Sequence, residues 1–297
     1  MEPFFESMQF IASLNFELIL NIAELSCIYA LVVLGVFLTS QIIKFDDLTV
    51  DGSFATGAAT TCTLILLGVP TFLVIILSTV AGALTGMATG LLHTKLKLNN
   101  LISGIVVTTG LFSVNLKMAG ANATLGQAKT VFDTIPTIFS GWWDHLFILT
   151  SISIVVILLV NFILKSEVGL LFKALGSNPQ ILINLGKNIH GYKIACLMLS
   201  NGIIALAGSL FIQHTGFFSM TGSIGTLGIA LAGLIIGDMI SNNLILKVFS
   251  GAIFYQTIIT ATIEFQVDPV WNKLITALLI VFLVTMRKQR TLFGFER

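Results

Sequence analysis

Long runs of apolar residues succeed one another along nearly the whole chain, and this feature leaves few folds open to it. A helix of roughly 20 apolar residues crosses the hydrocarbon core of a bilayer. The segments 18–43, 145–164 and 271–286 are close to that length and carry very few charged side chains. Charged residues are 10% of the 297, whereas a soluble domain carries about a quarter. The sequence therefore predicts a polytopic membrane protein.

The expected fold is an all-α helical bundle with about nine spans. Backbone polar groups are satisfied in lipid only within helices or closed barrels. The apolar runs are too long for barrel strands, which need about 9–11 residues, so helices remain. The nine candidate spans are residues 18–43, 54–70, 71–92, 99–119, 145–164, 193–213, 224–240, 246–264 and 271–286.

The distribution of Lys and Arg predicts the orientation of the chain. All three Arg residues lie in the tail 287–297, and basic residues favour the cytoplasmic side of a membrane. With nine spans, a cytoplasmic C-terminus also places twelve of the fifteen Lys and Arg residues on the cytoplasmic side. We therefore expect the C-terminus inside the cell and the N-terminus outside it.

The order of long spans and polar breaks predicts an inverted-topology repeat. The first span is followed by DDLTVDGSFATGAAT and the sixth by FFSMTGSIGTLGIALAG. Each of these stretches is a polar break that leads into a short segment rich in small residues. The expected halves are residues 1–119 and 193–286 of one transmembrane domain, joined by the linking span 145–164. An odd linker after four spans reverses the direction of the second half, as in many transporters.

The two polar breaks form the candidate translocation path. Broken helices leave unpaired backbone groups, which are tolerated in a membrane only where they face protein or water. Asp46 and Asp47, close to Lys44, are interpreted as ordinary residues at a membrane edge. For Asp51 and Ser53, a role in the path and a role in a simple turn are equally open. The candidate path residues are Thr49, Asp51 and Ser53 in the first half and Ser219, Thr221 and Ser223 in the second.

Glycines spaced four residues apart indicate close packing of helices. Small residues at this spacing allow two helix backbones to approach each other. The spacing serves either packing within one chain or a contact between two chains. The glycines concerned are Gly82, Gly86 and Gly90 in the third span and Gly233 and Gly237 in the seventh.

The other polar residues suggest no catalytic or metal site. Glu24 and Asp238 lie near span ends, where solvation explains them. The three Cys residues fall inside apolar runs without metal-ligand spacing, so we expect them to be reduced. The net charge of +1 offers no basic surface for nucleic acid.

Residues 165–192 form an unusually polar segment that the predicted orientation places in the cytoplasm. Within it, SNPQILINLG is typical of one short helix. Ser177 or Asn178 can cap its start, Pro179 suits its first position, and Gly186 can end it in a left-handed conformation. Ile181, Leu182 and Leu185 then make an apolar face outside the bilayer, and a groove on a partner protein explains that face best.

The segment ALGSNPQILINLGKNIHGYK resembles the cytoplasmic coupling segment of the permease subunits of bacterial ATP-binding-cassette (ABC) importers, in the branch that serves branched-chain amino acids and simple sugars. DLTVDGSF is similar to an element that follows the first central helix of this family. DPVWNKLITALLIVFLV is similar to a subgroup associated with aromatic amino acid uptake. Ile181 and Leu182 depart from the family's usual alanine pair, and Lys187 departs from its usual isoleucine. The matching residues are Ala174, Gly176, Asn178, Pro179, Gly186, Asn188, Ile189 and Lys193.

The resemblance implies a multi-pass subunit of the bacterial inner membrane that moves a small solute. A cytoplasmic ATPase would bind ATP and Mg²⁺, since this chain contains no G-x-x-x-x-G-K-[ST] phosphate loop. An external binding protein would deliver the solute, and a second permease, either identical or different, would complete the path. The residues implied to couple to the ATPase are Gly176, Ser177, Asn178, Pro179, Leu182 and Gly186.

Two other classes of function are open to a chain of this kind. An ion-coupled secondary transporter could share the inverted repeat, but it would need ion-binding carboxylates within the membrane, and this sequence has few. A membrane-embedded enzyme would need a catalytic constellation within the spans. None is evident among them.

Overall fold

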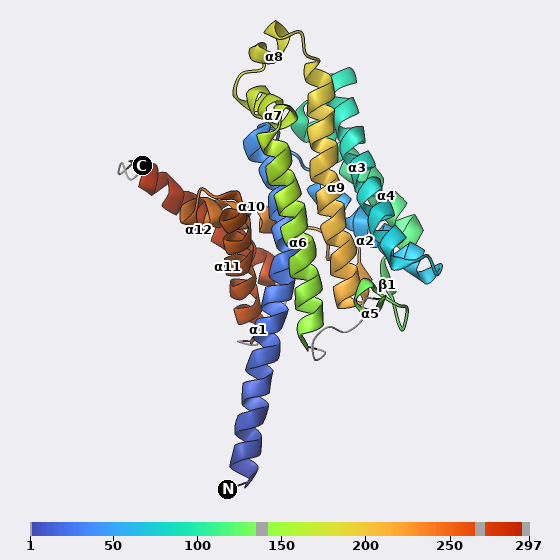
Figure 1. Ribbon diagram of the computed structural model, residues 1–297, viewed down its shortest axis with the longest axis vertical. Coiled ribbons are helices and arrows are strands. Elements are labelled where there is room, and N and C mark those ends of the chain that lie inside the picture. The colour runs from blue at the N-terminus through green and yellow to red at the C-terminus, as the bar shows by residue number, and fades with distance from the viewer. Residues whose placement is uncertain (1, 135–141, 265–270, 293–297) are drawn as a thin grey trace.

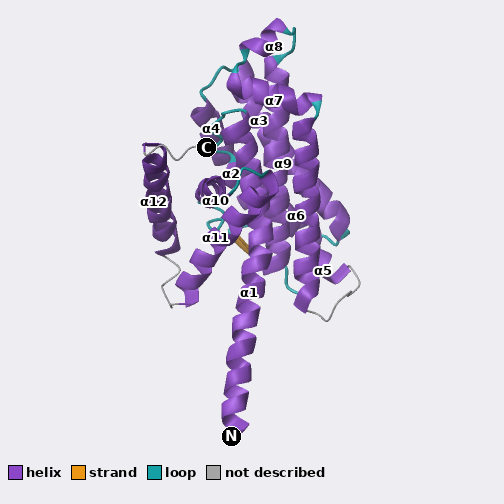
Figure 2. Cartoon of the chain, turned by 60° about the vertical axis from the view of Figure 1, so that its left-hand side comes forward, coloured by secondary structure: helices purple, strands orange, loops and turns teal. Residues whose placement is uncertain are grey.

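The computed structural model describes residues 2–134, 142–264 and 271–292. Of the predicted tail, residues 293–297 lie outside these ranges. The described chain folds into one helical bundle with a single small two-stranded sheet, so the all-α prediction is confirmed (Figures 1 and 2). The first half contains α1 (Glu2–Phe37), the π-helix η1 (Leu38–Ile42), α2 (Val50–Leu66), α3 (Thr71–Lys95), α4 (Asn100–Ala119), β1 (Asn122–Thr124) and α5 (Val131–Thr134). The linker and second half contain α6 (Trp142–Lys165), α7 (Glu167–Ser177), α8 (Gln180–Asn184), α9 (Ile189–Thr215), β2 (Phe217–Ser219), α10 (Thr226–Ile240), α11 (Leu244–Glu264) and α12 (Asn272–Leu292).

Each of the nine predicted spans coincides with a helix, but the helices differ in length. Among the described residues, six helical stretches are long and apolar enough to cross a membrane. The helices that fill predicted spans two, seven and nine do not meet that test. α2 has 17 residues and α10 has 15, so a helix of about 1.5 Å rise per residue covers only part of a bilayer there. The six long stretches are Phe16–Ile42, Thr71–Lys95, Asn100–Ala119, Trp143–Lys165, Ile189–Thr215 and Leu244–Thr262.

The packing of the helices follows the predicted inverted repeat, which equates α1–α4 with α9–α12. α3 packs along α9 in the first half, and the corresponding α11 packs along α1 in the second. α2 contacts α3, α4 and α9, and its counterpart α10 contacts α11, α12 and α1. α6 links the halves and lies against α1 (Figure 1). α1 and α9 contact each other at the centre of this arrangement.

The core of the bundle is built from α1 and α9. The membrane-crossing parts of these two helices are mostly buried, whereas α3, α4, α6 and α11 expose most of theirs. Exposed Leu, Ile, Val and Phe side chains on the outer helices fit a lipid-facing surface. The short helices α7 and α8 lie together at one end of the bundle, opposite the N-terminal end of α1 (Figure 1). α12 runs along the outer edge next to α10 (Figure 2).

Candidate translocation site and coupling surface

The first break lies between η1 and α2, and it returns into the interior of the bundle. Residues 43–49 follow the π-helix without regular structure, and π-helical turns are frequent at functional sites. Lys44 adopts a positive φ of 50° at the turn. The break then reaches Asn201, which lies near the middle of α9. α2 therefore begins inside the bundle, beside the midpoint of a membrane-crossing helix.

A buried polar network fills the interior at this break. Asp47 is 5% exposed, and its carboxylate accepts hydrogen bonds from the Thr49 backbone N–H and the Asn201 amide, each at 2.8 Å. The Ser53 hydroxyl donates to the side-chain amide oxygen of Asn201 at 2.6 Å and contacts the Thr85 hydroxyl at 2.5 Å. Buried polar groups with these partners rigidify a core and specify one packing arrangement.

This network corrects the interpretation of Asp47 as a residue at a membrane edge. Asp46 is exposed, but Asp47 is buried because residues 43–49 turn inward rather than along the surface. The motifs in the sequence did not indicate the partners of Asp47, Ser53 and Thr49, which are Asn201, Thr85 and Thr89. A polar amide in the middle of the apolar stretch LMLSNGIIALAG was the available signal, because such residues are costly in a membrane unless they have partners.

The second break lies between α9 and α10, and it mirrors the first. α9 ends at Gly216, whose φ of 69° is left-handed, and β2 then pairs antiparallel with β1. A turn over residues 220–225 leads to Gly225, whose φ of 101° favours glycine, and α10 starts at Thr226. Ser219, at the end of β2, is half-buried, and in the turn Thr221 is exposed and Ser223 is buried.

Asp51 joins the two breaks directly. Its carboxylate accepts one hydrogen bond from the Gly225 backbone N–H at 2.9 Å and another from the Leu227 backbone N–H at 2.8 Å. These N–H groups belong to the start of α10, where a helix lacks internal partners and carries partial positive charge. Asp51, at the start of the half-helix α2, therefore caps the half-helix α10 of the other half. Both short helices thus begin at one point inside the bundle.

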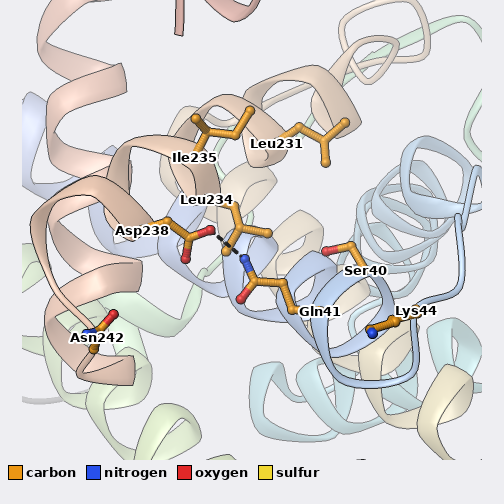
Figure 3. Close-up of a pocket in the computed structure, with 8 residues that line it drawn as sticks. All are labelled: Ser40, Gln41, Lys44, Leu231, Leu234, Ile235, Asp238 and Asn242. Carbon is orange, nitrogen blue, oxygen red and sulfur yellow. Dashed lines mark hydrogen bonds between the residues drawn. The ribbon is translucent and has the colours of Figure 1, made fainter. Parts of the chain in front are cut away.

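A polar pocket of about 650 Å³ lies at the opposite end of α10, between it and η1 (Figure 3). In this pocket Gln41 donates a hydrogen bond to the Asp238 carboxylate at 2.7 Å. Lys247 of α11 forms an ion pair with the same carboxylate at 2.7 Å. The sequence predicted solvation for Asp238, but the packing of α11 on α10 gives it Lys247 as an ion-pair partner. The lining residues are Ser40, Gln41, Lys44, Leu231, Leu234, Ile235, Asp238 and Asn242.

The glycine stripes pack helices of the same chain against one another. A Cβ on Gly82 would lie 2.5 Å from the Asn201 carbonyl oxygen, and one on Gly86 would overlap the Leu197 carbonyl. Gly90 faces Ile194 in the same way, so all three let α3 approach α9. A Cβ on Gly237 would overlap the Lys247 carbonyl of α11, whereas a Cβ on Gly233 would lie 2.9 Å from Val33 of α1 and 3.5 Å from Gly251 of α11. These contacts use the stripes for packing within one subunit.

The predicted coupling segment contains two short helices, α7 and α8, where the sequence suggested one. The start of α8 is held by Asn178, whose side-chain oxygen accepts from the Gln180 N–H at 3.0 Å. Its end is a Schellman motif: Gly186, with φ of 66°, donates to the Ile183 carbonyl, and Lys187 donates to the Leu182 carbonyl. The expected cap and left-handed stop are therefore both present.

The apolar face of this segment differs from the expected one. Leu182 is fully buried and belongs to the main hydrophobic cluster together with Phe172 and Leu175 of α7. The short helix α8 packs against α7, and this contact turns Leu182 toward the interior. Ile181, Ile183 and Leu185 are 43%, 53% and 60% exposed, and these three side chains are the candidate coupling face.

The other predicted coupling residues divide in the same way. Ser177, Asn178, Pro179 and Gly186 are exposed at the surface. Gly176 is half-buried, and a Cβ there would overlap the Ile42 carbonyl at the end of η1. The segment is therefore in backbone contact with the start of the first break.

In the described residues, no group of three His, Cys, Asp or Glu side chains is placed to hold a metal ion. Cys27, Cys62 and Cys196 are buried free thiols.

The chain matches the family model described as the permease component of the branched-chain amino acid transport system, over residues 18–284. It is 32% identical over 273 residues to a protein of Clostridioides difficile (strain R20291) named "Tyrosine transport system permease protein", covering 90% of each chain. It is 30% identical over 286 residues to the uncharacterized protein RP368 of Rickettsia prowazekii (strain Madrid E), covering 93% of this chain and all of that one.

A structural likeness supports the same fold. The chain aligns with a chain in the structure of PsaBC from Streptococcus pneumoniae in complex with Fab, with a TM-score of 0.55. The alignment covers 95% of this chain and 94% of that one at 14% identity. At this level of identity, the alignment shows that the two chains share an arrangement of helices.

Proposed function

This chain belongs to the family of branched-chain amino acid transport system permease components, and on that premise we propose that it forms the solute path of an ABC importer. It is a multi-pass membrane protein and a transport component. A separate ATPase would bind ATP and Mg²⁺ and drive it. Its solute is a small molecule, namely an amino acid with an aromatic side chain.

The observation that carries this proposal is the meeting of the two helix breaks at Asp51. In transporters with inverted repeats, solute sites lie where discontinuous helices of the two halves meet. Here the Asp51 carboxylate binds the start of α10 across the halves. A shift of one half against the other must act on this contact, as alternating access requires.

The coupling face supplies the attachment for the ATPase. Ile181, Ile183 and Leu185 expose apolar surface at the end of the bundle that carries α7 and α8. Short apolar helices of this kind commonly dock into a groove of a partner protein. Force applied there would reach the first break through Gly176, which abuts the end of η1.

The remaining parts of the proposal concern location, partners and solute. The end that carries α7 and α8 faces the cytoplasm of a bacterial cell, as does the C-terminus. A binding protein delivers the solute at the other end, and a second copy of the chain completes the path. The name of the C. difficile relative, a tyrosine transport system permease protein, supports an aromatic solute.

The test is uptake of labelled tyrosine by cells that produce the chain or lack it. Uptake should require the chain, stop when ATP is depleted, and survive collapse of the ion gradients. Uptake that fails only when the gradients collapse would instead show an ion-coupled transporter.

The coupling face is tested by Ile183→Asp, with Leu67→Asp as the matched control. Both side chains are exposed, but Leu67 ends α2 at the opposite end of the bundle. Ile183→Asp should abolish uptake and the ATP hydrolysis that co-purifies with the chain, while membrane levels stay normal. Equal activity of the two variants would contradict the proposed docking.

A further inference from the structure

A second cavity, lined by aromatic rings, lies where α9 ends and α2 begins. We infer that this aromatic pocket binds the ring of an aromatic amino acid during transport, an inference that rests on the function proposed above. The pocket has a volume of about 240 Å³. Its rings are those of Phe54, Phe211, Phe217 and Phe218, and Ser219 and Ser223 line its polar side.

The ring walls are held in position by their own packing. Phe54 and Phe211 lie with ring centroids 5.5 Å apart at 56°, and Tyr29 stacks on Phe54 at 6.5 Å and 5°. Aromatic pairs favour centroid separations of about 4.5–7 Å in tilted or offset arrangements. Phe54 and Phe218 are almost fully buried, whereas Phe217 remains 44% exposed. A solute ring would therefore meet fixed walls and one exposed ring at the edge.

The size of the aromatic pocket suits one side chain. Sites for drug-sized ligands measure roughly 300–1,000 Å³, and this pocket is smaller. It can hold a single ring while the charged amino and carboxylate groups of an amino acid stay at the polar side. An aliphatic side chain would fill the same space without the ring-to-ring attraction.

The hydroxyl groups at the polar side are only weakly engaged by the protein. Ser219 and Thr221 hydroxyls lie 3.2 Å apart, and the Ser223 hydroxyl donates to the Ser219 carbonyl at 3.4 Å. Good hydroxyl hydrogen bonds are near 2.7–2.8 Å, as between Thr226 and the Ser223 carbonyl at 2.7 Å. The weakly bonded hydroxyls can therefore turn to the polar groups of a solute at little cost.

The position of this pocket in the repeat ties it to the path. The aromatic pocket lies between the end of α9 and α2, and the polar pocket of Figure 3 lies between η1, which continues α1, and α10. The inverted repeat equates these two junctions and places one at each end of the bundle. The first is walled by rings, and the second by Gln41, Lys44 and Asp238. A solute thus meets an aromatic site at one end and a polar, charged site at the other.

The experiment is photolabelling of the full chain in membranes of the producing cells with p-azido-L-phenylalanine. Label should attach within the peptides that contain Phe54 and residues 211–223. Excess L-tyrosine should prevent this labelling, and excess L-leucine should not. Phe211→Leu and Phe217→Leu should lower the labelling roughly three- to tenfold, the range expected for loss of one aromatic contact. Phe162→Leu, on an exposed position of α6, should not change it.

Different results would overturn the assignment of the aromatic pocket and the proposed solute class. If wild-type cells take up tyrosine but label attaches elsewhere, or both pocket variants label like wild type, the aromatic pocket is not the solute site. Label that neither amino acid prevents would show a lipid or other apolar occupant and would also overturn the inference. If wild-type cells take up no aromatic amino acid, the proposed solute class itself is wrong.

Discussion

The contact between Asp51 and the start of α10 yields the sharpest prediction. Asp51→Asn preserves the shape of the side chain but removes its charge and one of its two acceptor oxygens. The present carboxylate accepts two backbone N–H bonds, of 2.9 and 2.8 Å. Hydrogen bonds to charged groups contribute about 1.5–3 kcal/mol each. Asparagine can keep one of them in weaker, neutral form.

We therefore expect Asp51→Asn to lower the free energy of unfolding by about 2 kcal/mol. The favourable charge at a helix start adds at most about 2 kcal/mol in a partly buried site, so a loss above about 5 kcal/mol would need another cause. The change can be measured by titrating SDS into the purified protein in mild detergent micelles and following helix content. Tyrosine uptake should fall as well, because both halves would lose their shared contact.

The control is Asp46→Asn, which removes the same charge from an exposed position in the same break. Exposed substitutions of this kind usually change stability by less than about 0.5 kcal/mol. If Asp51→Asn and Asp46→Asn unfold alike, the Asp51 contact contributes nothing to the union of the halves. The meeting of the two breaks at Asp51 would then have no functional role.

Two further substitutions test the packing of the bundle and of the coupling segment. Gly86→Ala would place a methyl group against the Leu197 carbonyl, so it should cost about 1–3 kcal/mol of stability through overpacking; Gly110→Ala, in the interior of α4 where nothing lies within 4 Å, should instead stabilise the protein by up to about 1 kcal/mol in the same SDS titration. Leu182→Ala should leave a cavity in the fully buried cluster under α8 and cost about 2–5 kcal/mol, which limited proteolysis would detect as faster cleavage of residues 178–188. Ile183→Ala, at an exposed position, should leave cleavage unchanged, and equal cleavage of the two variants would contradict the inward orientation of Leu182.

The coupling segment shows how far local sequence reasoning extends. The cap at Asn178 and the stop at Gly186 follow from residue preferences that act within a few positions, and both are present. The side of α8 that turns inward was not predictable, because Ile181, Leu182 and Ile183 are equally apolar. Only the placement of α8 against α7 decides that Leu182 is buried.

The interior shows the complementary limit. Asp47 is close to Lys44 in the sequence, which predicts a surface residue. Its hydrogen-bond partner Asn201, however, lies 154 positions away. Asp51 and Gly225 are 174 positions apart. No pattern within either break indicates that the two meet, although the repeat did predict that they occupy equivalent places.

The sequence by itself determined the class of the protein, the approximate positions of its helices and the repeat that relates its halves. It could do so because a bilayer requires each span to satisfy its own backbone hydrogen bonds as a helix. The hydropathy and length of each apolar segment therefore predict the span locally. The tertiary structure alone decided which polar groups meet: Asp47 with Asn201, Asp51 with the start of α10, and the rings of α2, α9 and β2 around one cavity. Those contacts depend on how distant helices pack, and packing is set by close approaches such as that of Gly86 to Leu197 rather than by any single stretch of sequence.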